Sequence, residues 1–398
     1  MPQIDFIISN DSHHVAMFLP IVRALAASGH YRCRIVSLCE FRGLVSPTGR
    51  FDMERVSLRK VLPIKIRSSP TVGQQVGGMR ATGLRQLARA VSWFGLLQPN
   101  VRRCFDRAPD LVVLPNDAAF PYDHICRWLR ARGIPFLLVQ EGIRFPLPGA
   151  IDGDTYGQGG AAAVAAWGQT SADYFRRQGV PDERIHLTGS PRYDELLAAD
   201  WQPEARRLKQ QWGWDDKNLL FLSNPIDDQG FCTTPEKYDL IRRFIRAIEP
   251  LFDDPGFRLI IKLHGRESLR DVQALVAGLA YARQISVLGV GPVYPLFLLS
   301  RAAIVLASTV GLEALLFGLP LGVLEIPRVG FVYDYVARGA ARGLTWSQPM
   351  LGQVRELLDG AVGDRGLIEA YVSETLVGRA GATDRVVQLI ARLVDGNR

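Results

Sequence analysis

The sequence predicts an α/β protein with two doubly wound, Rossmann-like domains that face each other across a cleft. Short apolar runs alternate with helical patterns along most of the chain, and this alternation falls into two blocks that join near residues 198–216. Such alternation indicates parallel sheets covered by helices on both faces. The length of 398 residues also suits two domains, at about 150 residues each. We place them at residues 1–200 and 201–375, with a C-terminal helix at 376–398 that can pack back on the N-terminal domain.

The strands of the first block are predicted from short apolar runs bounded by Gly, Pro or polar residues. We expect strands at residues 4–9, 33–38, 111–114, 135–140, 163–167 and 185–187. Helical spacing of apolar residues predicts helices at 14–28, 83–105, 122–132 and 171–178. Gly29 directly follows the first of these helices, and glycine is the preferred residue at a helix C-terminus.

The second block repeats the alternation of strand and helix. Its apolar runs predict strands at residues 219–223, 258–263, 285–288, 303–306 and 321–324. Helices are expected between them at 235–252, 269–278, 293–301 and 310–317, and helices dominate from residue 332 to the end. Ligands of such sheets bind beyond the C-terminal ends of the strands, so the loops that follow the strands are where the reactive site is expected.

The strand-loop-helix segment at residues 303–320 is the strongest candidate for a nucleotide site. Its apolar strand breaks at Ser308 and Thr309, and a helix begins at once. The unpaired amides of a helix N-terminus suit phosphate oxygens. Glu313 lies one turn further on, where it can accept hydrogen bonds from ribose hydroxyls, and Gly311 would let a ligand approach closely. The alternative is a capped core helix whose Glu313 is merely solvated.

Other polar residues follow the remaining strands of the second block. Ser223 ends the first strand, and Lys262 and His264 end the second, where alternation puts them on one face. A lysine and a histidine that converge there can neutralise pyrophosphate oxygens. The alternative for His264 is a hydrogen-bonded core histidine. Gly291 follows the third strand and completes the candidate nucleotide-binding residues.

The sequence lacks the motifs of a dinucleotide site, of an ATPase site and of a metal site. No GxGxxG sequence opens either block, which disfavours a Rossmann dehydrogenase, and no Walker lysine motif indicates an ATPase. No DxD-type pair stands at a strand end, and Asp227-Asp228 is a weak metal candidate because it lies in a loop of Pro, Gln and Gly. We therefore expect no metal site and no cofactor.

Candidate acid-base residues follow two strands of the first block. His13 and His14 lie where the first strand gives way to a helix, and Glu141 follows the strand at 135–140. An imidazole titrates near neutral pH and can take a proton from a sugar hydroxyl. The alternatives are an N-cap cluster with exposed histidines and, for Glu141, an ion pair with Arg144.

The net charge of +7 is unevenly distributed. Residues 50–107 contain twelve Lys and Arg against three acidic residues, and an expected helix in this segment carries Trp93, Phe94, Leu96 and Leu97. A basic amphipathic element can rest on an anionic membrane or grip an anionic acceptor. The alternative is an ordinary solvated face. No recognition motif accompanies the charge, so we expect no nucleic-acid partner.

Cysteine usage and hydropathy bear on the location of the protein. The five cysteines form no CxxC pair, and no apolar run is long enough to span a membrane. We expect a cytoplasmic protein that can make peripheral contact with the inner face of the membrane.

Taken in order, four segments resemble the GT-B glycosyltransferase superfamily, in particular the transferases of bacterial capsule, lipopolysaccharide and teichoic-acid type. They are residues 12–30, 165–196, 261–267 (IKLHGRE) and 307–325 (ASTVGLEALLFGLPLGVLE). The resemblance implies a nucleotide-sugar donor in the C-terminal domain, with its phosphates at Ser308 and Thr309 and its ribose at Glu313. It implies that Lys262 and His264 lie near the diphosphate, and that His13, His14 or Glu141 is the base. The implied acceptor is a hydroxyl of a glycan or lipid-linked glycan, and the implied role is surface polysaccharide biosynthesis.

Three other functions stay open. Residues 141–144 (EGIR) resemble the EAGLR segment of non-hydrolysing UDP-N-acetylglucosamine 2-epimerases, with one residue fewer. The Ser-Gly-Gly run of those epimerases is replaced here by Ser308-Thr309-Val310-Gly311, which favours a transferase. A CDP-polyol phosphotransferase and a catalytically inactive GT-B binding protein are the remaining alternatives.

Overall fold

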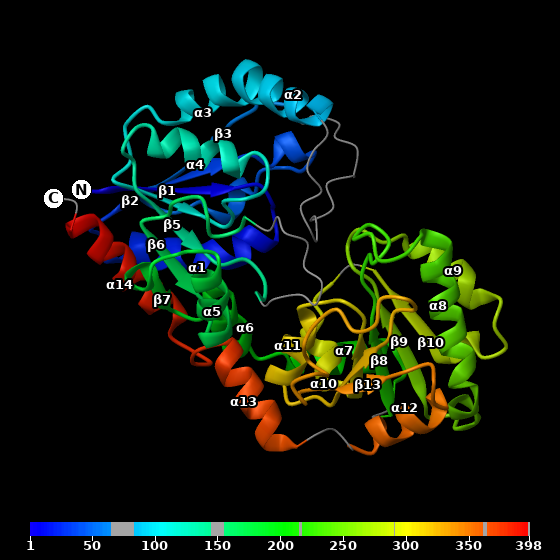
Figure 1. Ribbon diagram of the computed structural model, residues 1–398. Helices are drawn as coiled ribbons and strands as arrows, with labels where there is room; N and C mark the ends of the chain where they lie inside the picture. The colour runs from blue at the N-terminus through cyan, green and yellow to red at the C-terminus, as the bar shows by residue number, and fades with distance from the viewer. Residues whose placement is uncertain (65–82, 145–154, 215–216, 290, 361–363, 397–398) are drawn as a thin grey trace. The chain divides into compact units, whose positions relative to one another are not determined.

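The computed structural model describes residues 1–64, 83–144, 155–214, 217–289, 291–360 and 364–396, and of residues 83–86 the backbone only. Contacts divide the chain into two compact units, which we describe separately (Figure 1). Unit 1 comprises Met1–Ala199 and Ser373–Arg398, and unit 2 comprises Asp200–Val372. Part of the basic segment, residues 65–82, lies outside the described residues.

Unit 1 is built on a parallel sheet. Within the described residues it has seven strands in the order β3-β2-β1-β4-β5-β6-β7. They are β1 (Gln3–Ile8), β2 (Arg32–Ser37), β3 (Val56–Lys60), β4 (Leu111–Leu114), β5 (Phe136–Val139), β6 (Ala163–Ala166) and β7 (Ile185–Leu187). The doubly wound parallel sheet predicted for this block is confirmed. The sequence analysis missed β3, an edge strand that is half-exposed and therefore lacks an apolar run.

Helices cover both faces of the unit 1 sheet. They are α1 (His13–Ser28), α2 (Gly83–Val91), α3 (Gln98–Cys104), α4 (Tyr122–Arg130), α5 (Gln169–Arg177), α6 (Pro191–Ala198) and α14 (Ala382–Asp395). The helix predicted at 83–105 is present as α2 and α3, joined by a π-helical turn, η3 (Ser92–Leu97).

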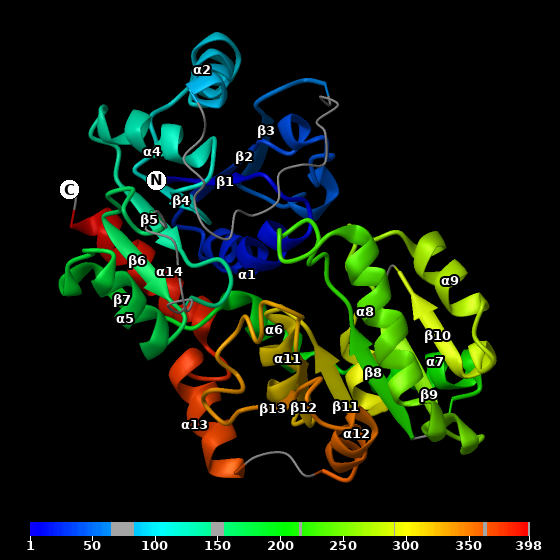
Figure 2. The same cartoon turned by 45° about the vertical axis from the view of Figure 1, so that its right-hand side comes forward.

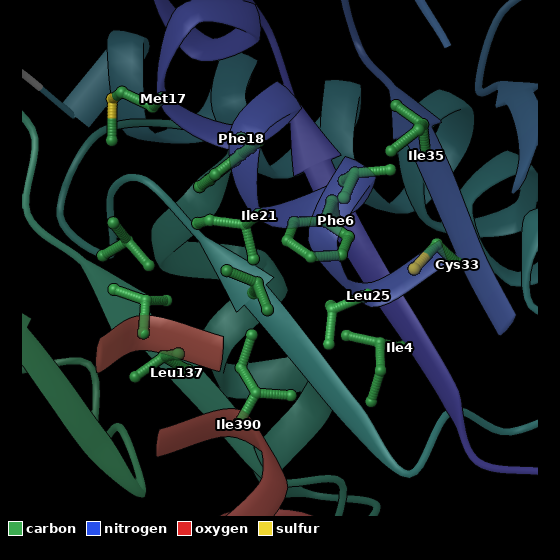
Figure 3. Packing of buried hydrophobic residues seen from close by; sticks show 14 of the residues in the cluster. Ile4, Phe6, Met17, Phe18, Ile21, Leu25, Cys33, Ile35, Leu137 and Ile390 are labelled. Carbon is green, nitrogen blue, oxygen red and sulfur yellow. The ribbon is translucent and has the colours of Figure 1, made fainter. Parts of the chain in front are cut away.

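The core of unit 1 follows from the alternation of side chains along each strand. Ile4 and Phe6 of β1 belong to a buried cluster on one face, and Ile7 belongs to the cluster on the other. Figure 3 shows the first cluster, in which the Phe6 ring lies 5.4 Å from that of Phe18 in α1. Ile390 of α14 packs into the same cluster, so the C-terminal helix helps to cover this face.

Unit 2 repeats the parallel architecture. Its six described strands run in the order β10-β9-β8-β11-β12-β13. They are β8 (Asn218–Leu222), β9 (Arg258–Lys262), β10 (Ile285–Leu288), β11 (Ser300–Val305), β12 (Leu321–Leu324) and β13 (Arg342–Leu344). The second predicted sheet is thereby confirmed. The helix expected to run to residue 301 was too long, because α10 ends at Leu298 and β11 begins at Ser300.

The helices of unit 2 pack on this sheet (Figure 2). They are α7 (Gln202–Trp212), α8 (Thr234–Ala247), α9 (Leu269–Ala277), α10 (Tyr294–Leu298), α11 (Val310–Leu316) and α12 (Met350–Leu358), and α13 (Arg365–Thr375) leads back to unit 1. Helix α8 lies over β8, with the rings of Phe221 and Phe244 5.3 Å apart.

Strand order locates the candidate binding regions within each unit. The order reverses between β1 and β4 in unit 1, and between β8 and β11 in unit 2. In open parallel sheets, ligands bind outside the carboxyl ends of the strands at such reversal points. The loops that begin at Ser9 and Pro115 in unit 1, and at Ser223 and Leu306 in unit 2, are therefore the ones to examine.

Candidate functional site

The loop between β1 and α1 is held by one asparagine. The side-chain oxygen of Asn10 accepts hydrogen bonds from the amides of Ser12 (3.0 Å) and His13 (2.6 Å). Ser12 occupies the N-cap position without a side-chain cap bond. The side chain of Asn10, rather than that of the N-cap residue, therefore takes these amides. The two histidines that follow are thus fixed at the start of α1.

His14 is buried and its tautomer is set by the backbone. Its Nδ1 accepts the amide hydrogen of Ser9 at 3.0 Å, and the hydroxyl of Tyr122 lies 3.5 Å from the same nitrogen. In a neutral imidazole the proton must then be on Nε2. That Nε2 lies 3.3 Å from Oε1 of Glu141. His14 therefore donates to Glu141 and orients its carboxylate.

Glu141, two residues after the end of β5, is surrounded by hydrogen-bond donors. Nε2 of His13 lies 3.7 Å from its Oε1, and Nδ2 of Asn116 lies 3.5 Å from its Oε2. Burial by itself raises the pKa of Glu141, but the imidazoles of His14 and His13 outweigh it and hold that pKa well below its usual range. Glu141 is therefore ionised at neutral pH, with 14% of its side chain exposed.

His13 is the more accessible of the two histidines, with 29% of its side chain exposed against 3% for His14. Burial lowers the pKa of His13 to about 4, and the positive charge of Arg192 adds to this, although Glu141 acts in the opposite direction. The ring is therefore neutral near pH 7 and can accept a proton, with the carboxylate of Glu141 beside it to stabilise the charge formed.

We expect the ring of His13 to titrate near pH 4, because protonating it in this partly buried position costs more than in water. In the unfolded chain the pKa is near 6.5, so the unfolded state takes up this proton first. The contribution of His13 to stability is therefore complete above about pH 6.5 and is lost as the pH falls toward 4. Histidine-selective NMR titration of the full chain measures the midpoint, with exposed His30 as the internal control. A midpoint for His13 near 6.5 would contradict this environment.

The structure brings the three predicted residues His13, His14 and Glu141 together within unit 1. Sequence reasoning missed Asn116, Tyr122 and Tyr156. The hydroxyl of Tyr156 accepts the amide hydrogen of Glu141 at 2.9 Å and donates to the carbonyl of Pro115 at 3.2 Å, which ties the loops after β5 and β4 together. Asn116 could have been found from its position, since it follows the strand at 111–114 by two residues.

In unit 2, an asparagine joins the loops at the point where the strand order reverses. The side chain of Asn224, beyond β8, donates to the carbonyl of Ala307 at 2.8 Å and accepts the amide hydrogen of Ala307 at 3.3 Å. This pair of bonds fixes the loop after β11 against the loop after β8. Ser223 and Ser308, which flank Asn224 and Ala307 in the sequence, are thereby held at one edge of the sheet.

Glu267 organises the neighbouring loop after β9. Its Oε2 accepts the amide hydrogen of His264 at 2.8 Å, and its Oε1 accepts the hydroxyl hydrogen of Ser223 at 2.7 Å. The same Oε1 lies 3.5 Å from Nζ of Lys237, a buried lysine that also pairs with Asp227 at 2.8 Å. The sequence analysis gave neither Lys237 nor Glu267 a role. Asp227, one of the two residues of the weak metal candidate Asp227-Asp228, is thus engaged in an ion pair with Lys237.

Lys262 and His264 make different contacts from those expected. The ammonium of Lys262 donates to the carbonyls of Leu263, at 3.1 Å, and of Gly289, and burial lowers its pKa. His264 reaches solvent, and its Nδ1 accepts the amide hydrogen of Arg266 at 3.2 Å. Desolvation and the charges of Arg266 and Lys262 lower the pKa of His264. A neutral His264 can hydrogen-bond a ligand but does not add a positive charge.

The start of α11 is more internally bonded than the sequence suggested. The hydroxyl of Ser308 accepts the amide hydrogen of Val310 at 3.3 Å. The hydroxyl of Tyr335 accepts the amide hydrogen of Leu312 at 3.1 Å and donates to the carbonyl of Ser308 at 3.1 Å. The expectation that the first amides of this helix are unpaired is therefore corrected for Val310 and Leu312. Thr309 is the N-cap and makes no side-chain cap bond.

Three further residues of the predicted nucleotide site are Gly311 and Glu313 in α11 and Gly291 after β10. A Cβ on Gly311 would meet the Tyr335 ring at 2.9 Å, so the group that approaches this glycine is a tyrosine of the same unit. Glu313 is buried, with 2% exposed, and so is not merely solvated. Gly291, after β10, has a φ of 115° and open space where a Cβ would stand. Within the described residues, no group of three or more His, Cys, Asp or Glu side chains is placed to hold a metal ion.

Known proteins resemble this chain in structure. No protein-family model and no curated protein matches the sequence. A UDP-GlcNAc 2-epimerase from Methanocaldococcus jannaschii, solved with UDP-GlcNAc and UDP, matches with a TM-score of 0.65 at 14% identity, over 98% of this chain and 99% of that chain. MnaA of S. aureus, solved with UDP, matches with 0.59 at 16% identity, over 99% and 97%.

A third similar structure is that of the wall teichoic acid polymerase TagF, with a TM-score of 0.56 at 12% identity, over 99% of this chain and 89% of that chain. At such identities the likeness concerns the fold alone. It agrees with the two parallel α/β sheets of the two units and with the GT-B type of fold that the sequence predicted.

Proposed function

We propose that this protein is a nucleotide-sugar enzyme that inverts C2 of a UDP-N-acetylhexosamine, in the manner of a UDP-N-acetylglucosamine 2-epimerase. The observation that carries the proposal is the ionised Glu141 held between two imidazoles, His13 and His14, at the end of the unit 1 strands. The epimerases of similar fold support the choice of reaction. It differs from the transferase that the sequence alone favoured.

The chemistry of such an inversion suits the residues of unit 1. The C2–H bond is not acidic, so a base can remove that proton only as UDP departs from C1, which leaves a C1–C2 double bond. Addition of a proton from solvent to the opposite face of C2, with return of UDP to C1, completes the inversion without net oxidation, and His13 releases to solvent the proton that it took. His13, neutral and partly exposed, takes the proton, and Glu141 stabilises the imidazolium formed. His14 holds Glu141 in place.

In unit 2 we assign the nucleotide to the edge formed by the loops after β8, β9 and β11. Ser308 and Thr309 contact the diphosphate, and the buried carboxylate of Glu313 accepts the ribose hydroxyls. Lys262, His264 and Gly291 border this edge, and Ser223 is oriented by Glu267. The assignment depends on the hydrogen bonds that fix these loops to one another.

A glycosyltransferase is the second candidate. It is favoured by the same neutral His13 beside a carboxylate, because that pair also suits removal of a proton from an acceptor hydroxyl. The similar fold of the TagF polymerase agrees with it. The acceptor would then be a glycan or a lipid-linked glycan.

Incubation of the full chain with UDP-GlcNAc in D2O distinguishes the two functions. An epimerase gives deuterium at C2 and the C2 epimer in the NMR spectrum without any acceptor. A transferase gives neither, and releases UDP only when an acceptor hydroxyl is supplied. Absence of C2 exchange, in a sample that binds UDP by calorimetry, would overturn the epimerase proposal.

Removing the carboxylate charge of Glu313 is expected to weaken UDP binding by about 10- to 100-fold, the range for a hydrogen bond to a charged group. Glu313→Gln keeps the size of this buried side chain and so avoids a cavity. Calorimetry with UDP measures the effect, and exposed Glu369→Gln in the same unit is the control. Unchanged affinity in Glu313→Gln would remove Glu313 from the nucleotide site.

A further inference from the structure

A stripe of exposed apolar side chains runs along α2 and η3 of unit 1. Leu87, Val91 and Phe94 are 61%, 64% and 63% exposed. Their spacing of four and three residues places them on one side of the helix. On the opposite side, Trp93 and Leu97 are buried in the core of unit 1. The η3 part of this element is therefore anchored in the core of unit 1, and α2 leads directly into it (Figure 1).

A basic groove lies beside this stripe. Its volume is about 640 Å³, and its walls come from α2, η3, the start of α3 and the helix α4. The arginines that line it are Arg89, Arg127 and Arg132, and the aromatic residues are Trp93, Phe94 and Trp128. Phe94 thus belongs to both the stripe and the groove.

The charge of the groove is positive. Asp123 is the carboxylate among its lining residues, and it is already paired with Arg127 at 3.1 Å and with His124 at 2.9 Å. The guanidinium of Arg132 lies 4.4 Å from the centre of the Trp128 ring, and that of Arg89 lies 5.9 Å from the Phe120 ring. These ring contacts help to hold the two guanidiniums in position, and Nη1 of Arg132 also donates to the carbonyl of Trp128 at 3.4 Å.

Further positive charge lies on the next helix along the chain. Arg102 and Arg103 are exposed on α3, one helical turn beyond η3. Exposed apolar side chains next to arginines, on a helix whose other side is packed, are the pattern of an element that lies in the surface of an anionic membrane. Among the described residues, no helix is long and apolar enough to cross a bilayer, so contact of this kind would be at the surface.

We propose that the α2–α3 face of unit 1 docks on anionic phospholipid. Leu87, Val91 and Phe94 enter the interface, and the arginines of the groove and of α3 contact lipid phosphates. Charge complementarity selects this occupant, because three groove arginines face one already paired carboxylate. The apolar stripe favours a membrane over a purely polyanionic partner, because burial of these side chains stabilises a complex only where the partner offers an apolar phase.

Each basic residue near an anionic leaflet strengthens attachment by about fivefold, and salt screens this attraction. Arg102→Glu with Arg103→Glu is therefore expected to weaken binding by about 25-fold or more. Val91→Ser with Phe94→Ser removes two interfacial side chains and is expected to weaken binding by about tenfold or more. Arg102 and Arg103 are charged and exposed, and Val91 and Phe94 are exposed as well. The fold of unit 1 is therefore expected to be retained in both double variants.

Co-sedimentation of the full chain with vesicles tests the proposal. One set contains phosphatidylcholine alone, and the other contains phosphatidylcholine mixed with phosphatidylglycerol. We expect binding to the mixed vesicles only, fading as salt rises and weakened in both double variants. Arg177→Glu with Arg206→Glu changes the net charge equally at exposed positions elsewhere and should bind like the unaltered protein.

Two results would overturn the proposal. One is no binding of the unaltered protein to the mixed vesicles at low salt. The other is that the Arg102/Arg103 and Val91/Phe94 double variants, shown by circular dichroism to be folded, bind as well as the Arg177 and Arg206 control.

Discussion

Replacing His13 with glutamine is expected to lower the turnover of a nucleotide-sugar substrate by about 10²- to 10⁴-fold, the usual contribution of a general base. The reason is geometric and electrostatic: His13 is the partly exposed imidazole of the cluster, its low pKa keeps it neutral, and Glu141 lies 3.7 Å away. Affinity for UDP should change little, because the nucleotide is assigned to unit 2. Steady-state kinetics and calorimetry on the same preparation measure the two quantities.

His30→Gln is the matched control, since His30 is an exposed histidine of the same unit. Glu141→Gln should also lower turnover, because it removes the charge that stabilises the protonated ring. His14→Gln should act through misplacement of Glu141, so its effect should be smaller than that of His13→Gln. If the three single variants all keep full activity, the acid-base role of this cluster is wrong.

Replacing Lys237 with methionine is expected to destabilise unit 2 by about 3–5 kcal/mol, because it leaves buried carboxylates without their partner. Lys237 is 4% exposed at its side chain, and it lies 2.8 Å from Asp227 and 3.5 Å from Glu267, whose side chain is 1% exposed. Burial alone lowers the pKa of Lys237, but these two carboxylates outweigh it and raise that pKa, so the lysine is charged. Chemical denaturation followed by tryptophan fluorescence measures the loss.

The control for this variant is Lys217→Met, which breaks an exposed ion pair with Asp254 in the same unit. Exposed pairs contribute at most about 1 kcal/mol. Equal effects of the two substitutions would show that the Lys237 network does not stabilise unit 2. Because Glu267 also holds Ser223 and the amide of His264, Lys237→Met should weaken UDP binding in the fraction that stays folded.

The acid-base cluster was predictable in part. His13, His14 and Glu141 follow strand-like runs, and in a parallel sheet the carboxyl ends of all the strands lie at one edge. The different hydrogen bonding and burial of His13 and His14 were not predictable. They depend on which nitrogen of His14 accepts the amide hydrogen of Ser9 and on how deeply each ring is buried. His13 and His14 are adjacent in the sequence, yet we assign His13 as the base and His14 as the residue that positions Glu141.

For the candidate nucleotide loop after β11, the secondary structure was predictable but the hydrogen bonds were not. Its strand, turn and helix were correctly placed from the sequence, but the hydroxyl that bonds the α11 backbone comes from Tyr335, more than twenty residues further along the chain. A local pattern of residues 303–320 contains no sign of that contact. The bonds from Lys237 to Glu267 and Asp227 likewise join segments whose separate patterns are ordinary.

The two parallel α/β sheets could be predicted from the residues alone, because buried parallel strands must be apolar throughout and the helices between them must show one apolar face. It also placed the candidate residues at strand ends. It missed β3 and β13, where edge position removes the need for an apolar run. Protonation and hydrogen bonding at these sites could not be predicted in this way, because desolvation and ion pairing depend on what surrounds a side chain in space.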